Sequence, residues 1–146
     1  MTASNHVVTG ALIVTIVHNP VLGLTLALLS HPFLDMVPHF GVEPTRMMAF
    51  LPGFLADVAI ALSVLIALII VRPDQYILLI AGGIAAASTD LLNIPEFIDA
   101  LRHRPHHKGP IRRFLSWIQW SQTVPGLIVE FVWFFSVGSL LLGRLS

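Results

Sequence analysis

Three long apolar runs constrain the fold more than any other feature of this sequence. They cover residues 47–71, 76–94 and 124–143, and each contains a single charged residue, namely Asp57, Asp90 and Glu130. A helix that crosses the hydrocarbon core of a bilayer needs about 20 mostly apolar residues, so each run is long enough to span it. We therefore expect an all-α protein, a polytopic membrane helical bundle that forms a single domain over residues 1–146.

Two shorter apolar runs precede the long ones and have polar residues at their ends. They cover residues 6–17 and 21–37 and are joined by the tripeptide HNP at residues 18–20. We expect them to form an N-terminal helical hairpin beside the spanning helices. Residues 114–122 are amphipathic and carry tryptophans, which favour the membrane interface. They predict a short interfacial helix that leads into the last span.

The overall composition agrees with a chain that lies in lipid. Hydrophobic residues make up 55% of the sequence and charged residues 11%, whereas soluble domains carry about 25% charged residues. Basic and acidic residues balance, so the charge gives no sign of a nucleic-acid partner and we expect none; the expected partners are membrane lipids. The chain has no cysteine, which excludes disulfides and thiolate zinc sites.

The basic residues indicate which way the chain sits in the cell membrane. Five of the eight basic residues lie in the loop at residues 102–113, and loops rich in Lys and Arg stay in the cytoplasm. We therefore expect a multi-pass protein whose loop 102–113 is cytoplasmic. Alternation of the helices then brings most of the ionisable residues of the apolar runs to the cytoplasmic end. These residues are His6, His31, Asp35, His39, Asp57, Asp90 and Glu130.

The segment SHPFLDMVPHF at residues 30–40 carries the strongest chemical signal. His31 and Asp35 are four residues apart, which places them on one face of a helix. Pro38 is expected to end that helix and leave His39 on a turn. Imidazole and carboxylate are the usual zinc ligands where thiolates are absent, and ionisable groups in spanning segments are costly and commonly functional. The alternative is a polar helix end at which His31 and Asp35 pair with each other.

Other ionisable residues join this segment in the predicted site. Asp90 follows a stretch of small residues that lets helices approach closely, and His6 converges on the same end of the bundle. Asp57 is expected either to act in catalysis or to form a hydrogen bond between helices. The metal ligands predicted from the sequence are His6, His31, Asp35, His39 and Asp90.

The basic loop offers groups for binding and proton transfer. His103 and His107 are expected to complete the metal shell or to act as a general acid. Arg102 and Arg104 are expected to bind an anionic substrate group, because guanidinium groups bind phosphate in bidentate geometry. The alternative is an ordinary basic loop that contacts anionic lipid headgroups.

The order of these motifs resembles that of the membrane-bound metal-dependent hydrolases of bacteria and archaea. The shared elements are a histidine followed by TGALI, then LSHPFLDMVPH, a small-residue helix that ends in Asp, and a basic loop rich in histidine. That family usually has Pro-Asp where this chain has Thr89 and Asp90. It often has His-Arg-x-x-Thr-His where this chain reads HRPHHKG, so His106 or His107 would have to replace a ligand.

The spacing of His31 and Asp35 is also similar to that in zinc-dependent phospholipase C sites. The resemblances imply zinc ions that activate water against a phosphodiester. We therefore expect a divalent metal, zinc with manganese or iron as alternatives, and a hydrolase that acts on a phosphoester of a lipid or lipid-linked substrate at the cytoplasmic face. The alternatives are a small transporter and a non-enzymatic metal-binding or structural membrane protein.

Overall fold

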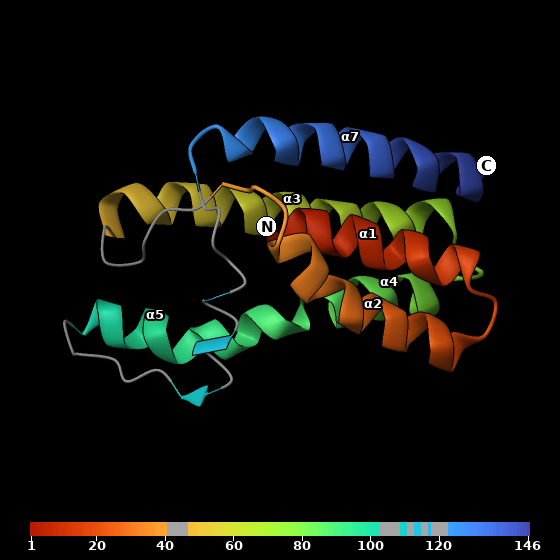
Figure 1. Cartoon of the computed structure of the whole chain (residues 1–146). Helices are drawn as coiled ribbons and strands as arrows, with labels where there is room; N and C mark the ends of the chain where they lie inside the picture. The colour runs from red at the N-terminus through yellow and green to blue at the C-terminus, as the bar shows by residue number, and fades with distance from the viewer. Residues whose placement is uncertain (41–46, 103–108, 111–112, 115–116, 118–122) are drawn as a thin grey trace.

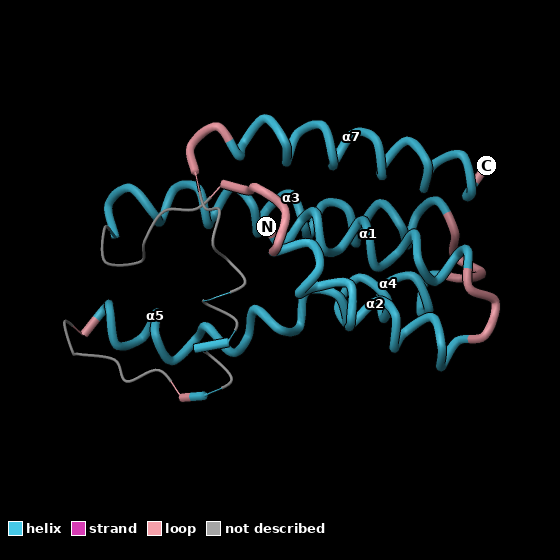
Figure 2. The backbone as a smooth tube through the Cα atoms, viewed as in Figure 1, coloured by secondary structure: helices cyan, strands magenta, loops and turns pink. Residues whose placement is uncertain are grey.

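The computed structural model describes residues 1–40, 47–102, 109–110, 113–114, 117 and 123–146, and within these ranges it contains helices and no strand (Figure 1). Figure 2 shows how little of the described chain is loop. The helices, in chain order, are α1 (Ala3–Ile16), α2 (Pro20–Asp35), α3 (Met47–Val71), α4 (Tyr76–Ala87), the 3₁₀ helix η1 (Ser88–Asn93), α5 (Ile94–Leu101) and α7 (Gly126–Leu145).

Three helical segments are long and apolar enough to cross a membrane, as the sequence predicts. They are Leu51–Val71, Tyr76–Asn93 and Gly126–Leu145. Only 11% of the most apolar window in Leu51–Val71 is buried inside the protein. An apolar surface of this extent marks a face that contacts lipid or another protein rather than water. The predicted all-α fold is therefore confirmed, with three helical segments long and apolar enough to cross a membrane.

The predicted N-terminal hairpin is also present, but α1 lies deeper than expected. The turn between its helices ends at Asn19, whose Oδ1 accepts a hydrogen bond from the Leu22 N–H at 3.1 Å. Pro20 follows in the first turn of α2, where its missing N–H costs no helical hydrogen bond. Helix α1 contacts α2, α3, α4 and α7 and so forms the centre of the bundle (Figure 1).

Two glycines allow α1 and α4 to approach backbone to backbone. A Cβ added to Gly10 would collide with the carbonyl oxygen of Gly82, and a Cβ added to Gly82 would lie 2.7 Å from the carbonyl oxygen of Gly10. Small residues at such positions bring helix axes close together. This contact fixes the distance between the first turn of α1 and the end of α4.

The chain after α4 differs from the prediction. The helix tightens into η1 and then continues as α5, which lies beyond the predicted apolar run at residues 76–94. Pro95 fits the first turn of α5, and the Phe97 ring lies 5.7 Å from the Phe54 ring of α3, centroid to centroid. The predicted interfacial helix at residues 114–122 falls largely outside the described residues.

Candidate metal centre

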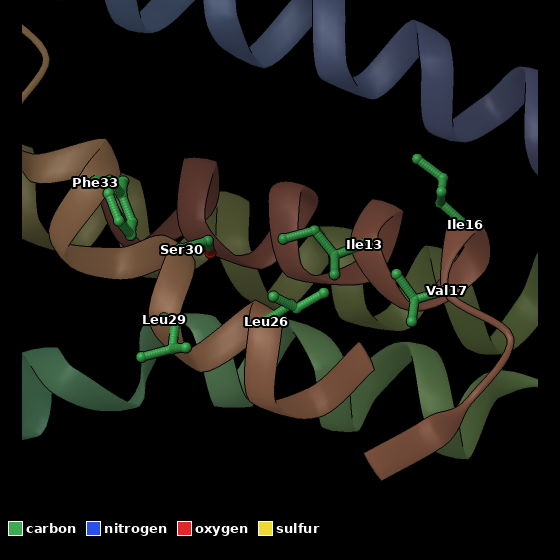
Figure 3. Close-up of a pocket in the computed structure, with 7 residues that line it drawn as sticks. All are labelled: Ile13, Ile16, Val17, Leu26, Leu29, Ser30 and Phe33. Atoms are coloured by element: carbon green, nitrogen blue, oxygen red, sulfur yellow. The ribbon is translucent and has the colours of Figure 1, made fainter. Parts of the chain in front are cut away.

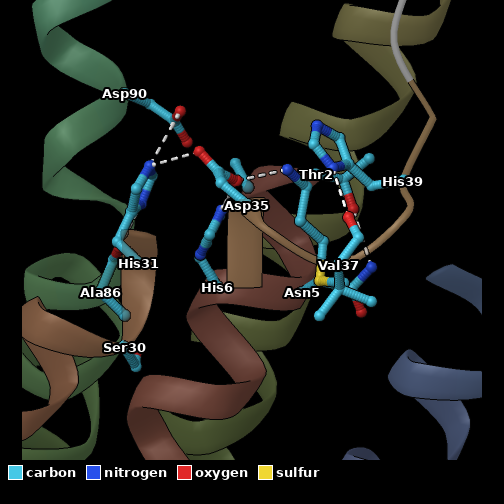
Figure 4. Close-up of polar contacts among 12 residues, drawn as sticks. Thr2, Asn5, His6, Ser30, His31, Asp35, Val37, His39, Ala86 and Asp90 are labelled. Carbon is cyan, nitrogen blue, oxygen red and sulfur yellow. Dashed lines mark hydrogen bonds and ion pairs between the residues drawn. The ribbon is translucent and has the colours of Figure 1, made fainter. Parts of the chain in front are cut away.

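A cluster of three potential metal ligands forms where α1, α2 and η1 meet (Figure 4). One ligand atom each from His6, His31 and Asp90 lies within 4.8 Å of the others. These residues are 25 and 59 positions apart in sequence, so the fold rather than local spacing brings them together. All three belong to the set of ligands predicted from the sequence.

Asp35 contacts both histidines of this cluster. Its Oδ1 lies 3.2 Å from His6 Nε2, and its Oδ2 lies 3.2 Å from His31 Nε2. Asp90 approaches from the other side, with Oδ1 3.7 Å from His31 Nε2. The two imidazole rings are stacked, with centroids 3.9 Å apart and planes 12° from parallel. Two carboxylates and two imidazoles therefore face one small volume.

The tautomer of His31 is set by the backbone of α4. His31 Nδ1 lies 2.8 Å from the carbonyl oxygen of Ala86, and that oxygen can only accept a hydrogen bond, so Nδ1 carries the proton. In the neutral ring, Nε2 then presents a lone pair toward Asp35 and Asp90. Metal-binding histidines are typically held by such a hydrogen bond from their other ring nitrogen.

His6 gives the clearest sign that a group belongs in this volume. It is 0% exposed; its Nδ1 has no hydrogen-bond partner among the described residues, and its Nε2 faces Asp35 Oδ1 at 3.2 Å. Buried polar atoms are nearly always satisfied, because leaving one without a partner costs about 1–3 kcal/mol. A cation between the imidazoles and carboxylates would satisfy His6 and offset the negative charge.

One positive group already contacts this cluster. The amino group of Met1 lies 2.5 Å from Asp35 Oδ1, and both side chains are buried. It supplies one positive charge against the two carboxylates of Asp35 and Asp90. The cluster therefore retains a negative charge unless a histidine is protonated or a metal ion binds.

His39 lies outside the group of three but close to it. It follows the end of α2, as expected from Pro38, and Figure 4 shows the Asp35 carboxylate between His39 and Asp90. His39 Nδ1 lies 2.8 Å from the Val37 carbonyl oxygen, whereas Nε2 has no hydrogen-bond partner among the described residues. Burial lowers the pKa of the His39 imidazole, which keeps the ring neutral near pH 7.

Asp57, predicted as a catalytic group or a helix contact, binds backbone instead of the histidines. Its carboxylate accepts hydrogen bonds from the N–H groups of Ala3 at 2.7 Å and Ser4 at 3.0 Å. These N–H groups belong to the first turn of α1, where no helical acceptor exists and the helix dipole favours negative charge. This arrangement corresponds to the second role expected for Asp57, a hydrogen bond between helices.

Glu130 has a similar role on α7. It accepts hydrogen bonds from the N–H groups of Thr2 at 3.1 Å and Phe40 at 3.2 Å. The residue is 4% exposed. It therefore joins α7 to the start of α1 and to the segment that carries His39.

The remaining predicted residues are in the basic loop. His103, His107 and Arg104 lie outside the described residues. Arg102 is described and exposed at the end of α5, where its N–H donates to the carbonyl oxygen of Ile98 at 3.0 Å.

A groove of about 360 Å³ between α1 and α2 lies on another face (Figure 3). Its lining is almost wholly apolar and includes Phe33, which is 69% exposed. The hydroxyl of Ser30 lines it but donates to the carbonyl oxygen of Ala27 at 2.7 Å. The groove is therefore an apolar surface on this face of the protein.

Sequence reasoning missed the backbone groups that complete the cluster. The amino group of Met1 and the carbonyl of Ala86 carry no residue-type signal, so no motif could have identified them. The Glu130 carboxylate likewise accepts hydrogen bonds from the backbone N–H groups of Thr2 and Phe40, and from the Asn5 side-chain amide at 3.5 Å. Comparison with protein-family models, curated proteins and solved structures found no match to this chain.

Proposed function

We propose that this protein is a membrane-embedded, metal-dependent hydrolase that acts on a phosphoester of a lipid or lipid-linked substrate at the cytoplasmic face. In this proposal, His6, His31 and Asp90 hold a divalent cation, zinc with manganese or iron as alternatives. One observation carries it: the ligand atoms of these residues lie within 4.8 Å of one another, in a cluster where His6 is fully buried and its Nδ1 has no hydrogen-bond partner in the described chain.

The ligand set fits a catalytic centre better than a closed structural one. Catalytic zinc sites use three protein ligands and keep one coordination position open. The Asp90 side chain is 33% exposed, whereas that of Asp35 is 1% exposed, so the cluster is accessible from the Asp90 side. A divalent cation there makes water more acidic and polarises a phosphoryl oxygen. The protein contributes Asp35, which orients both imidazoles.

The distribution of ionisable residues supports a surface site rather than an ion pathway. The cluster, Asp57 and Glu130 gather at one end of the bundle, and Arg72 pairs with Asp74 at the other. Between these ends, the described parts of the bundle carry no Asp, Glu, Lys, Arg or His. A transporter that moves ions across the bilayer would need polar groups along its depth.

The position of the cluster supports a lipid substrate. Its helices expose apolar side chains, such as Leu29 on α2 at 49% and Leu91 on η1 at 62%. A lipid in the bilayer would therefore reach the cluster with its headgroup at the level of Asp90. The basic residues of the loop at 102–113 would attract an anionic headgroup.

The first test is metal content, measured by plasma mass spectrometry on protein purified in detergent. We expect stoichiometric zinc, manganese or iron in the wild type and its loss in the double variant His31→Ala, Asp35→Asn. The matched control is His18→Ala, because His18 is exposed in the hairpin turn at the far end. This variant should keep the metal.

The second test is hydrolysis of phospholipid vesicles and lipid phosphates by the metal-loaded protein. We expect release of phosphate or a phosphorylated headgroup by the wild type and by His18→Ala, and none by the double variant. Absence of metal from the wild type after reconstitution with each ion would refute the proposal.

A non-enzymatic structural role is the second candidate, and one observation favours it. The Met1 amino group already provides Asp35 with a cation at 2.5 Å, so the cluster could serve only to join helices. This candidate predicts no bound metal in the wild type. It also predicts that Asp35→Asn lowers stability without changing any activity.

A further inference from the structure

The apolar groove between α1 and α2 follows the axis of the helix that carries His31 and Asp35. Among the residues that line it are Ile13 and Val17 of α1 and Leu26, Leu29, Ser30 and Phe33 of α2. Figure 3 shows Phe33 at one end of the groove and Val17 at the other. From Leu26 to Phe33 the groove extends about 10 Å along α2, because a helix rises about 1.5 Å per residue.

One end of the groove lies at the level of the cluster. Phe33 lies between His31 and Asp35 in sequence and therefore in the same part of α2, but on a different side of the helix. Phe33 is 69% exposed, whereas His31 and Asp35 are each 1% exposed. The hydrocarbon core of a bilayer is about 30 Å thick, so a groove of this length fits within one leaflet. It has the direction of a lipid tail whose headgroup lies beside the cluster.

The volume of the groove suits a single hydrocarbon chain better than a helix of another protein. The groove has a volume of about 360 Å³. A helix with its side chains is about 10 Å across, so a piece of it 10 Å long occupies roughly 800 Å³. A partner helix could therefore insert only side chains, whereas a hydrocarbon chain can lie along the whole groove.

The lining selects an apolar ligand. Ser30 contributes a hydroxyl group to the lining, and this group already donates to the Ala27 carbonyl oxygen at 2.7 Å. Leu29 and Phe33 are 49% and 69% exposed, so the groove is open along its side and a chain can enter from the bilayer. Lipid tails are as apolar as leucine side chains, so close packing rather than the hydrophobic effect must favour the groove over bulk lipid.

We propose that this groove binds one acyl chain of a membrane phospholipid and thereby holds the phosphate of that lipid beside the cluster. The inference rests on the proposed function for the role of the lipid as substrate, and it adds the part of the protein that recognises the tail. A tail held in the groove restricts the movement of the phosphate, which is how binding of a remote part of a substrate raises the rate at the reacting group.

The first experiment labels the full-length protein in nanodiscs of phosphatidylcholine that contain a small fraction of phosphatidic acid with a diazirine on its acyl chain. After illumination, mass spectrometry locates the cross-linked residues. We expect the cross-links to concentrate on Ile13, Leu26 and Leu29. Leu28 is exposed on the same helix but lies outside the groove, and we expect little labelling there.

A matched pair of variants tests whether the groove itself is responsible. Leu26→Trp fills the groove, whereas Leu28→Trp adds the same side chain outside it; the two leucines are 40% and 45% exposed. Leu26→Trp should lose the labelling of Ile13 and Leu29, and Leu28→Trp should keep it. Metal content equal to that of the wild type in both variants would show that each of them folds.

The second experiment measures phosphate release from short-chain phosphatidic acids that are dispersed as monomers in water. For the wild type and Leu28→Trp, kcat/KM should rise by up to about fourfold for each methylene group added to the tail, until the groove is full. For Leu26→Trp, kcat/KM should change little with tail length. Glycerol phosphate, which has no tail, should be hydrolysed equally by all three proteins.

The outcomes separate this inference from the function on which it rests. Equal labelling of Leu28 and Leu29, or a wild-type kcat/KM that does not depend on tail length, would overturn the acyl-chain site and leave the proposed hydrolase standing. Selective labelling of a wild type that binds no metal would refute the hydrolase and keep the site. The chain has no native cysteine, so a disulfide-linked dimer of Leu26→Cys in membranes, absent from Leu28→Cys, would show a second copy in the groove and overturn the inference.

Discussion

Two pairs of carboxylates lie in the same end of the bundle and have different partners. Asp57 and Glu130 accept hydrogen bonds from backbone N–H groups at the start of α1 and after α2. Asp35 and Asp90 instead face Nε2 of His31. All four are acidic residues within apolar segments, and the sequence alone does not distinguish the pairs.

The contrast between the two pairs shows that a costly carboxylate in an apolar helix does not by itself mark a functional site. A backbone N–H at a helix start is a sufficient partner, because the first turn of a helix has donors without acceptors. Asp57 and Glu130 thereby stabilise the entry of α1 into the centre of the bundle. Asp35 and Asp90 instead lie beside imidazole nitrogens, and this combination of carboxylates and imidazoles suits a metal.

The largest expected difference is between the matched variants Asp90→Asn and Asp57→Asn. Each removes one negative charge without changing the shape of the side chain. Asp90→Asn should lower metal affinity about 100-fold, since even outer partners of metal ligands contribute 10–100-fold. Asp57→Asn keeps an acceptor oxygen for α1 and should change affinity only slightly. Isothermal titration of the metal into the apo-protein in detergent measures both.

Equal losses of metal affinity in these two variants would contradict the different roles assigned to Asp90 and Asp57. Asp57 would then act on the metal, as a catalytic or ligand role requires, despite its contacts with Ala3 and Ser4. Wild-type affinity in both variants would remove Asp90 from the ligand set. The residual ligands would then be the two histidines and Asp35.

The helices and the candidate ligands could be predicted from the sequence to different degrees. The apolar run at residues 47–71 coincides with α3, because apolar length alone determines a spanning helix. The spacing of His31 and Asp35 predicts their contact, which the 3.2 Å distance confirms. The approach of His6 and Asp90 followed only from the expected orientation of the helices.

The rest of the site depends on contacts that leave no pattern in the sequence. Stacking of His6 on His31 requires the close packing of α1 against α4 through Gly10 and Gly82. Periodicity identifies the face of a helix but not the neighbour that covers it. The partners of Asp57 and Glu130 are backbone groups, which every residue carries. For this reason the sequence could not separate the two pairs of carboxylates.

A smaller effect is expected from Glu130→Ala. The change leaves the N–H groups of Thr2 and Phe40 without their acceptor, and each orphaned buried donor costs about 1–3 kcal/mol. We expect the free energy of unfolding in mixed micelles to fall by about 2 kcal/mol, since part of the backbone can rearrange. Glu130→Gln, which keeps one acceptor oxygen, should lose less.

Metal affinity and the number of bound ions in the Glu130 variants test to which pair of carboxylates Glu130 belongs. Glu130 accepts hydrogen bonds from the segments that carry His6 and His39, so its loss should weaken metal binding modestly while the number of ions stays unchanged. A loss of stability with an unchanged number of bound ions would show that Glu130 has the same structural role as Asp57. A complete loss of metal would instead place it with Asp35 and Asp90.

The smallest effect is expected at the opposite end of the hairpin. Asn19→Ala removes the side-chain oxygen that caps α2 through the Leu22 N–H. Loss of such a cap costs about 1 kcal/mol, and thermal unfolding in detergent should show it. Metal content and phosphoester hydrolysis should stay at wild-type levels, because more than two helical turns separate Asn19 from His31. A drop in metal affinity would show instead that the hairpin transmits changes along its length, so that the cluster depends on the far turn as much as on the carboxylates beside it.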